Sequence, residues 1–252
     1  MAKHQIGEES TNNFGSILKI KKYRNYKDVD IDFPEYNWTV KHVDYSNFKK
    51  GSIKCPYERR YYGIGFLGEG NYKISDNGIP NKIYGVWRDM LKRCYVPDFH
   101  KKHPTYKNCT VCNEWHNFQN FAEWYEENYY EVGNEKMSLD KDILIKGNKI
   151  YSPDTCIFVP QNINLLFVKC DSTRGEYPIG VSYNKSRKKF RSRCRVNGKE
   201  VVIGYYDTTE EAFLAYKEFK EHYIKQIADE YIDLIPSTLY QAMITYEIDY
   251  ND

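Results

Sequence analysis

Residues 177–216 read YPIGVSYNKSRKKFRSRCRVNGKEVVIGYYDTTEEAFLAY, and this stretch decides the fold of the C-terminal part of the chain. Along residues 189–196, apolar or small side chains alternate with basic ones, which is the pattern of a half-buried strand. Asn197-Gly198 follows directly, and this pair favours a two-residue hairpin turn because both central residues need positive φ. Residues 181–183 and 200–205 therefore supply the first and third strands of a small antiparallel sheet.

A helix is predicted directly after the third strand. Thr208 and Glu211 have the spacing of a capping box, in which two side chains satisfy the free N–H groups of the first turn. One face of the helix is apolar, because five residues recur at helical spacing: Ala212, Tyr216, Phe219, Tyr223 and Ile227. We therefore predict a three-stranded antiparallel sheet covered by one long helix over residues 177–235.

The uncovered face of this sheet is expected to be strongly basic. No acidic residue occurs between Tyr177 and Lys199. Because a row of like charges repels itself, we predict that the face binds a polyanion, and a nucleic acid in particular. The alternative is a solvated face that only aids solubility. The candidate contact residues are Arg187, Lys188, Lys189, Arg191, Arg193 and Arg195.

The same stretch resembles the AP2/ERF DNA-binding domain of plant transcription factors and of phage and mobile-element endonucleases. The resemblance implies a sheet that lies in the major groove, with Arg193 and Arg195 on DNA-facing positions. Ser182 and Asn184 stand where arginines are usual, and Val202 replaces a tryptophan, so no particular target sequence is implied. The matching residues are Gly180-Val181, Phe190, Ile203-Gly204, Tyr206-Asp207-Thr208, Glu211-Ala212 and Tyr216.

Composition sets the bounds for the whole chain. Its 252 residues carry a formal net charge of only +2, so an affinity for DNA has to come from a local patch. No apolar run is long enough to span a membrane, and the N-terminus lacks an apolar signal region. The seven cysteines are an odd number and indicate reduced thiols. We expect a cytoplasmic protein without a membrane partner, in the host cytosol if it is a phage protein.

We predict an α+β protein with three parts. Residues 1–80 form a small β-rich module, with strands within 14–23, 29–33 and 38–43. Residues 81–170 form a central domain with helices at its start, and residues 177–252 form the domain of the sheet and the long helix. A short polar stretch, residues 169–176, is predicted to link the last two parts.

The central domain contains a cysteine-rich loop between two predicted amphipathic helices. Cys109 and Cys112 have the spacing of zinc ligands, and His116 with Cys94 or His103 could complete a tetrahedral site. A single pair of cysteines at this spacing is common without a metal. The alternative that we favour is that the cysteines are small core residues.

The end of the central domain suggests the frame of a nuclease. We expect a strand over residues 138–144, a turn at Gly147-Asn148, a return strand at 150–151 and a helix entered through 152–154. Together with residues 87–124, this segment resembles the HNH-like proteins of phages and prophages that carry a C-terminal AP2 domain. The resemblance implies a ββα-metal domain that cleaves DNA with Mg²⁺ or Mn²⁺.

The resemblance also implies roles for individual residues. Asp140 and a late asparagine, Asn164 or Asn162, would hold the metal, and Lys141 stands at the position of the general base. Lysine is a poor base at neutral pH unless its pKa is lowered. The residues that could fill the remaining roles are Asp142 (base or second ligand) and Asn148 or Thr155 (middle position).

Three functions therefore remain open from the sequence. The first is a metal-dependent DNA endonuclease of the HNH family, and the second is a DNA-binding, regulatory or anti-defence protein of phage type on a nuclease-derived scaffold that does not catalyse. The third is an inhibitor that binds a host or phage protein through the acidic side of a helix, formed by Glu123, Glu126 and Glu127.

Overall fold

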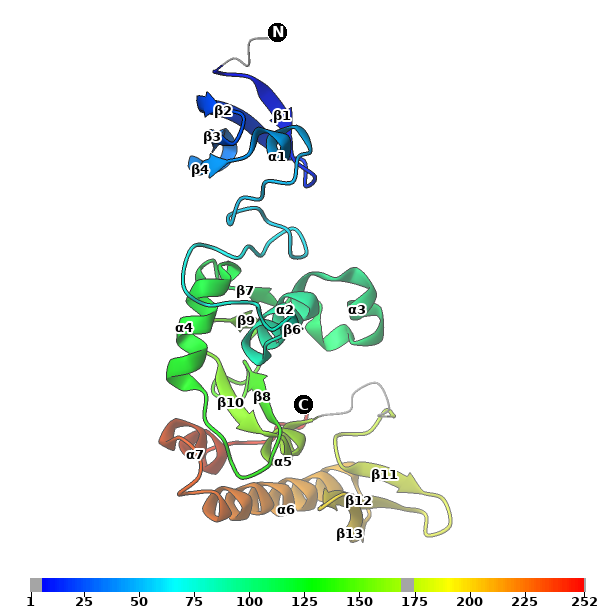
Figure 1. The fold of residues 1–252 in the computed structure, drawn as a ribbon. Coiled ribbons are helices and arrows are strands. Elements are labelled where there is room, and N and C mark those ends of the chain that lie inside the picture. The colour runs from blue at the N-terminus through cyan, green and yellow to red at the C-terminus, as the bar shows by residue number, and fades with distance from the viewer. Residues whose placement is uncertain (1–5, 169–174, 252) are drawn as a thin grey trace. The chain divides into compact units, whose positions relative to one another are not determined.

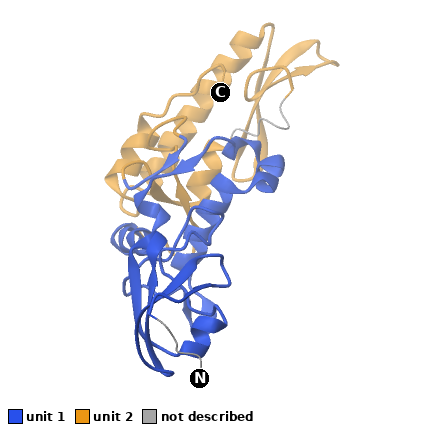
Figure 2. Ribbon diagram, turned by 90° about the horizontal axis from the view of Figure 1, so that it is seen from above, with its two compact units in different colours: residues 1–128, 149–153 blue, residues 129–148, 154–252 orange. Residues whose placement is uncertain are grey.

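The computed structural model describes residues 6–168 and 175–251, and it shows a mixed α+β protein. Most of the predicted linker, residues 169–174, lies outside the described residues. The chain forms two compact units (Figure 2). Unit 1 comprises residues 1–128 and 149–153, and unit 2 comprises residues 129–148 and 154–252. No helix in the described ranges has the length and apolar character needed to cross a membrane.

Unit 1 begins with a four-stranded antiparallel sheet in the order β1-β2-β3-β4 (Figure 1). Its strands are β1 (Glu9–Thr11), β2 (Ile17–Asn25), β3 (Asp28–Phe33) and β4 (Trp38–Val43). The three strands predicted within residues 1–80 are thereby confirmed. A 3-10 turn, η1 (Pro34–Tyr36), joins β3 to β4, and the short helix α1 (Tyr45–Lys49) follows. The core of this part contains Leu18, Ile20, Val29, Ile31, Phe33 and Phe48, all at most 1% exposed.

The rest of unit 1 is mainly helical. Trp87 and Phe118 lie in the two longer helices, their ring centroids are 5.4 Å apart, and the Trp87 indole donates to the Trp115 carbonyl over 2.7 Å. These contacts fix the pair of amphipathic helices that the sequence predicted. The elements are β5 (Ser75–Asp76), β6 (Ile79–Pro80), α2 (Lys82–Tyr95), α3 (Pro97–Lys102), η2 (Pro104–Tyr106), β7 (Thr110–Val111), η3 (Glu114–His116), α4 (Phe118–Asn128) and β9 (Ile150–Tyr151).

The segment with the predicted nuclease frame folds differently from the expectation. β8 (Met137–Asp140) pairs antiparallel with β10 (Ile157–Pro160), and the short α5 (Gln161–Asn164) and η4 (Leu165–Phe167) follow. The predicted return strand, β9, pairs instead with β7 in parallel. The prediction of a helix that begins at residues 152–154 is wrong, because the buried residues 157–160 form the strand β10. Such a short run fits a buried strand and a helix equally well.

The predicted sheet of the C-terminal part is present in unit 2. Its antiparallel strands are β11 (Val181–Asn184), β12 (Lys189–Val196) and β13 (Lys199–Tyr206), in that order. Asn197 and Gly198 have φ values of 47° and 76°, as the predicted hairpin turn requires. Thr208 and Glu211 form the full capping box of α6 (Thr209–Glu230), and α7 (Ser237–Ile244) ends the fold.

The long helix α6 takes part in two cores. Its first half covers the sheet, where Phe213 and Tyr216 pack with Val181 and Cys194. Its second half packs on β10, α5 and α7 through Ile224, Ala228, Ile157, Val159, Ile163, Leu239 and Met243. Residues 154–168 therefore share one compact unit with the sheet and its helix.

Candidate nucleic-acid interface

The sheet of β11–β13 has one covered face and one open face. On β12, Ser192 and Cys194 point toward α6 and are 0% and 5% exposed. The alternation of a strand then places Arg191, Arg193 and Arg195 on the opposite face, where they are half-buried or exposed. A β-bulge at residues 192–193 shifts the pairing by one residue without reversing these two faces. The predicted arginine row is therefore present on the open face.

One acidic residue lies among these arginines. Glu200 pairs with Arg195 across β12 and β13, and its carboxylate contacts the guanidinium groups of Arg193 and, over 3.5 Å, of Arg191. Glu200 and Arg193 are 45% and 42% exposed in their side chains, so water and salt screen the pair strongly. The open face keeps a positive excess, but less than the sequence alone indicated.

Aromatic and aliphatic groups complete the open face. Tyr205 pairs with Arg191 across the strands, and the guanidinium group of Arg187 lies over the Tyr205 ring, 4.3 Å from its centroid. Val202, opposite Arg193, is 44% exposed. The face thus combines cations with surfaces that can contact bases, including thymine methyl groups.

Two other predicted contact residues lie at the edge of this face. The Lys189 ammonium is 3.1 Å from the Asp207 carboxylate, and Lys188 lies in the exposed turn between β11 and β12 with a φ of 53°. The amide of Arg187, in the same turn, donates to the Asn184 side chain over 3.0 Å. Asn184, which replaces an arginine of the AP2/ERF pattern, therefore orders the basic turn.

Glu200 and Tyr205 are the residues of this face that sequence reasoning missed. The signal for Glu200 was available, because counting outward from the Asn197-Gly198 turn pairs residue 196 with 199 and 195 with 200. Tyr205 required knowledge of the bulge at residues 192–193, which changes the register and has no clear sequence signal.

The predicted metal ligands Asp140 and Asn164 lie near opposite ends of the β8–β10 pair. Asp140 pairs with Ile157, whereas Pro160, directly before α5, pairs with Met137 at the other end of β8. Three residues of strand span roughly 10 Å. Asn164 is also the last residue of a four-residue helix rather than a residue three turns into a long one. The expected convergence depended on a helix that does not form.

The environment of Asp140 suits a structural role. Its Oδ1 accepts hydrogen bonds from the amides of Asp142 and Ile143, over 2.9 Å and 2.8 Å, and so closes the turn after β8. Burial, and secondarily the neighbouring Asp142 carboxylate, raise the pKa of Asp140 above its usual value. In this structure the Asp140 carboxylate serves the turn after β8.

The predicted base, Lys141, is buried and points toward an acid. It is 6% exposed, and its ammonium lies 3.4 Å from the Asp142 carboxylate. Asn148 donates to the Lys141 carbonyl over 2.6 Å. The arrangement matches the ion-pair alternative, with Asn148 bracing the backbone. Of the other candidates, Asn162 donates to the Tyr231 hydroxyl over 3.4 Å, and Thr155 is half-buried two residues before β10.

The zinc alternative is not assembled either. Among the described residues, the one group of three potential ligands whose donor atoms lie within 4.8 Å of one another is Asp28, Asp30 and His42. Arg24 already fills that group with a two-pronged contact to Asp30 and a contact to Asp28. The four residues of the possible zinc site, Cys94, Cys109, Cys112 and His116, form no such group, and all three cysteines are buried or half-buried.

Comparison of the chain with protein-family models, with curated proteins and with solved structures finds no match. The resemblance to AP2/ERF and HNH proteins consequently remains a prediction from the motif residues. The function has to be argued from the geometry of the sheet.

Proposed function

We propose that this protein binds double-stranded DNA through the open face of β11–β13. The observation that carries the proposal is the row of Arg191, Arg193 and Arg195 on the sheet face opposite α6. Guanidinium groups suit both phosphate oxygens and the edge of guanine, and Glu200 offsets only part of the repulsion within the row, so a further anion would stabilise it.

The dimensions favour duplex DNA. Three strands at a spacing of about 4.8 Å give a backbone ribbon roughly 10 Å wide. The major groove of B-DNA is about 12 Å wide, whereas that of A-form RNA is too narrow for side chains to read. Eight basic residues and no acidic one lie in residues 185–199, so the turn can follow the phosphates while β12 faces the bases.

The proposal assigns no catalytic step to the chain. Asp140 closes a turn with its carboxylate, and Lys141 is paired with Asp142. In this function the segment 129–168 acts as a support for α6. The alternative, a Mg²⁺- or Mn²⁺-dependent endonuclease, is tested by nicking of supercoiled plasmid with either metal beside an EDTA control. Metal-dependent nicking that the Asp140→Ala substitution abolishes would favour the endonuclease function over the proposed one.

Binding itself is tested by titrating labelled duplex DNA with the wild type and with a double variant, Arg193→Ala with Arg195→Ala. The double variant should bind more weakly, and the slope of log K against log salt should be shallower by about 1–2. A matched control removes two exposed lysines of unit 1, Lys49→Ala with Lys50→Ala. The proposal fails if both double variants weaken binding equally or if neither does.

A further inference from the structure

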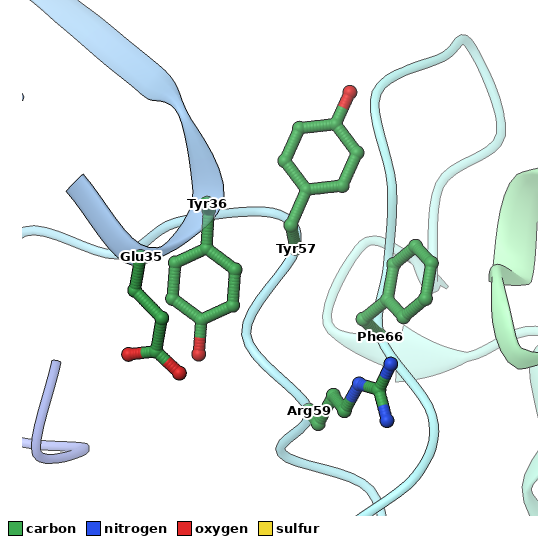
Figure 3. A pocket seen from close by; sticks show the side chains of 5 residues that line it. All are labelled: Glu35, Tyr36, Tyr57, Arg59 and Phe66. Atoms are coloured by element: carbon green, nitrogen blue, oxygen red, sulfur yellow. The ribbon is translucent and has the colours of Figure 1, made fainter. Parts of the chain in front are cut away.

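A pocket of about 500 Å³ lies in unit 1, where η1 and the segment after α1 approach each other. Its size falls in the range of small-molecule sites in proteins, about 300–1,000 Å³. The sequence gave no reason to expect chemistry here. Figure 3 shows the five side chains that line the pocket, Glu35, Tyr36, Tyr57, Arg59 and Phe66.

The walls of the pocket are tied together by hydrogen bonds. Glu69 accepts from the Trp38 indole over 2.9 Å and from the Tyr57 hydroxyl over 2.8 Å. Trp38 begins β4 directly after η1, so Glu69 joins the wall that carries Tyr36 to the wall that carries Tyr57. The Tyr57 and Phe66 rings lie 5.9 Å apart between centroids. The aromatic part of the pocket is thus formed before any ligand binds.

The backbone below the pocket is fixed as well. Glu58, between the lining residues Tyr57 and Arg59, is 1% exposed. Its carboxylate accepts from the buried Asn12 side chain and, over 3.3 Å, from the Cys55 amide. This buried anchor holds the neighbouring side chains of the segment at the surface, which reduces the entropy lost when a ligand binds.

The charged side chains of the pocket, Glu35 and Arg59, are exposed, and Glu35 accepts a hydrogen bond from the neighbouring Tyr36 hydroxyl. Arg59 is exposed, and it makes no ion pair or hydrogen bond with any residue that the structure describes. Figure 3 shows its guanidinium group beside Phe66, with the Glu35 carboxylate on the side of Tyr36. The pocket therefore offers a ligand its aromatic faces, the guanidinium group of Arg59 for an anionic group, and the carboxylate of Glu35 as an acceptor for N–H groups.

A nucleotide has the chemistry that matches this lining. Its base stacks on aromatic rings, its phosphate suits a guanidinium group, and the amino group of a base can donate to a carboxylate. A methylated ammonium ion also favours aromatic rings, but the charge of Arg59 would repel it. A purely apolar ligand would cover Arg59 without giving its charge a partner.

We propose that this pocket binds a nucleotide, either free or as an unpaired unit of a nucleic-acid strand. The site is separate from the open sheet face, since all of its residues belong to unit 1. The test of nucleotide binding in unit 1 is therefore independent of the test of duplex binding by unit 2.

The test uses the full chain and a fluorescent base analogue, 2-aminopurine, whose emission is quenched by stacking. Three probes are titrated: the deoxynucleoside, its 5′-monophosphate, and a single-stranded oligonucleotide with one such base. Saturable quenching of the monophosphate identifies a free nucleotide as a ligand, and quenching of the oligonucleotide alone identifies an unpaired unit of a strand. Both results support the pocket as a nucleotide site, and quenching by neither probe overturns it.

Variants locate the site. Arg59→Ala should weaken binding of either phosphate-bearing probe about tenfold or more and leave the nucleoside unchanged, because only the phosphate contact is lost. Phe66→Leu should weaken binding of every probe about 5- to 150-fold through lost stacking. The sheet variant, Arg193→Ala with Arg195→Ala, serves as the control. It should bind the monophosphate as tightly as the wild type does, and the same comparison is made with the oligonucleotide if only the oligonucleotide binds. Equal binding of the phosphate-bearing probe by Arg59→Ala and by the wild type would overturn the assignment. The variant should fold normally, because the Arg59 side chain is exposed and makes no ion pair or hydrogen bond with the described residues.

Discussion

Changing Glu200 to Gln should strengthen binding to duplex DNA. Glu200 contacts Arg191 and Arg193 on the open face and is the one acidic side chain that the structure places between these arginines among its described residues. A phosphate bound to Arg193 would lie about 6 Å from the Glu200 carboxylate, two hydrogen-bond lengths away. The substitution removes this repulsion and keeps the shape of the side chain.

The magnitude follows from Coulomb's law. Two unit charges about 6 Å apart repel by about 0.7 kcal/mol in bulk water and by about 3 kcal/mol at an effective dielectric constant of 20. Duplex affinity should therefore rise about threefold to a hundredfold at low salt, and the salt slope should steepen by up to about 0.9. The free energy of unfolding should fall by at most about 1 kcal/mol, because the ion pairs that are lost are partly exposed.

The assay is fluorescence anisotropy of a labelled duplex at several salt concentrations, with thermal unfolding as a check on the fold. Glu9→Gln is a suitable control, since Glu9 makes a comparable exposed pair with Lys19 in unit 1, where the side chains are 57% and 44% exposed. The control makes the same change in net charge. If a folded Glu200→Gln protein binds DNA no more tightly than the Glu9→Gln protein, then DNA does not lie on the open face.

Three further changes test the fold. Arg24 holds the pKa of Asp30 at about 2, against an ordinary value of 3.8. Asp30→Asn should therefore lower the free energy of unfolding by roughly 2 kcal/mol at neutral pH. Urea titrations of the wild type should show the full contribution above about pH 4 and its progressive loss as the pH falls toward 2. Gly180 has a φ of 80°, and a Cβ there would lie 2.1 Å from the Tyr216 ring. Gly180→Ala should therefore lower the melting temperature sharply. An unchanged melting temperature would contradict the packing of β11 on α6. Burial lowers the pKa of Lys220. The wild type should therefore become more stable as the pH rises from that lowered pKa toward about 10.5. The Lys220→Met variant should be more stable than the wild type at neutral pH, and its stability should not rise over this pH range.

Local signals in the sequence predicted the C-terminal sheet and helix well. Asn197-Gly198 sets the register of its hairpin as far as the bulge at residues 192–193, and the capping box of Thr208 and Glu211 marks the start of α6. Both signals act between neighbours along the chain, so they need no knowledge of tertiary packing. The alternating strand β12 was equally clear because one of its faces is buried.

The parts of the fold that the sequence did not predict depend on contacts between distant residues. Whether residues 156–160 form a strand or a helix depends on their pairing with β8, and that pairing decides where Asp140 and Asn164 lie. The pocket in unit 1 had no signal, because Tyr36, Tyr57 and Phe66 share no periodicity and the hydrogen bonds of Glu69 to Trp38 and Tyr57 join residues far apart in the sequence.

The two cores of α6 connect the segment of residues 129–168 to the three-stranded sheet. Ile157, Val159 and Ile163 are at most 9% exposed, and they pack on Ile224 and Ala228 in the second half of the helix. The first half of the same helix carries Tyr216, which packs behind the sheet. A rigid helix joins the two cores, so a change that loosens the β8–β10 pair will also loosen the support of the arginine face. Under the proposed function, the apolar residues of this segment hold α6 behind the sheet, while Asp140 closes a turn and Lys141 lies in an ion pair with Asp142.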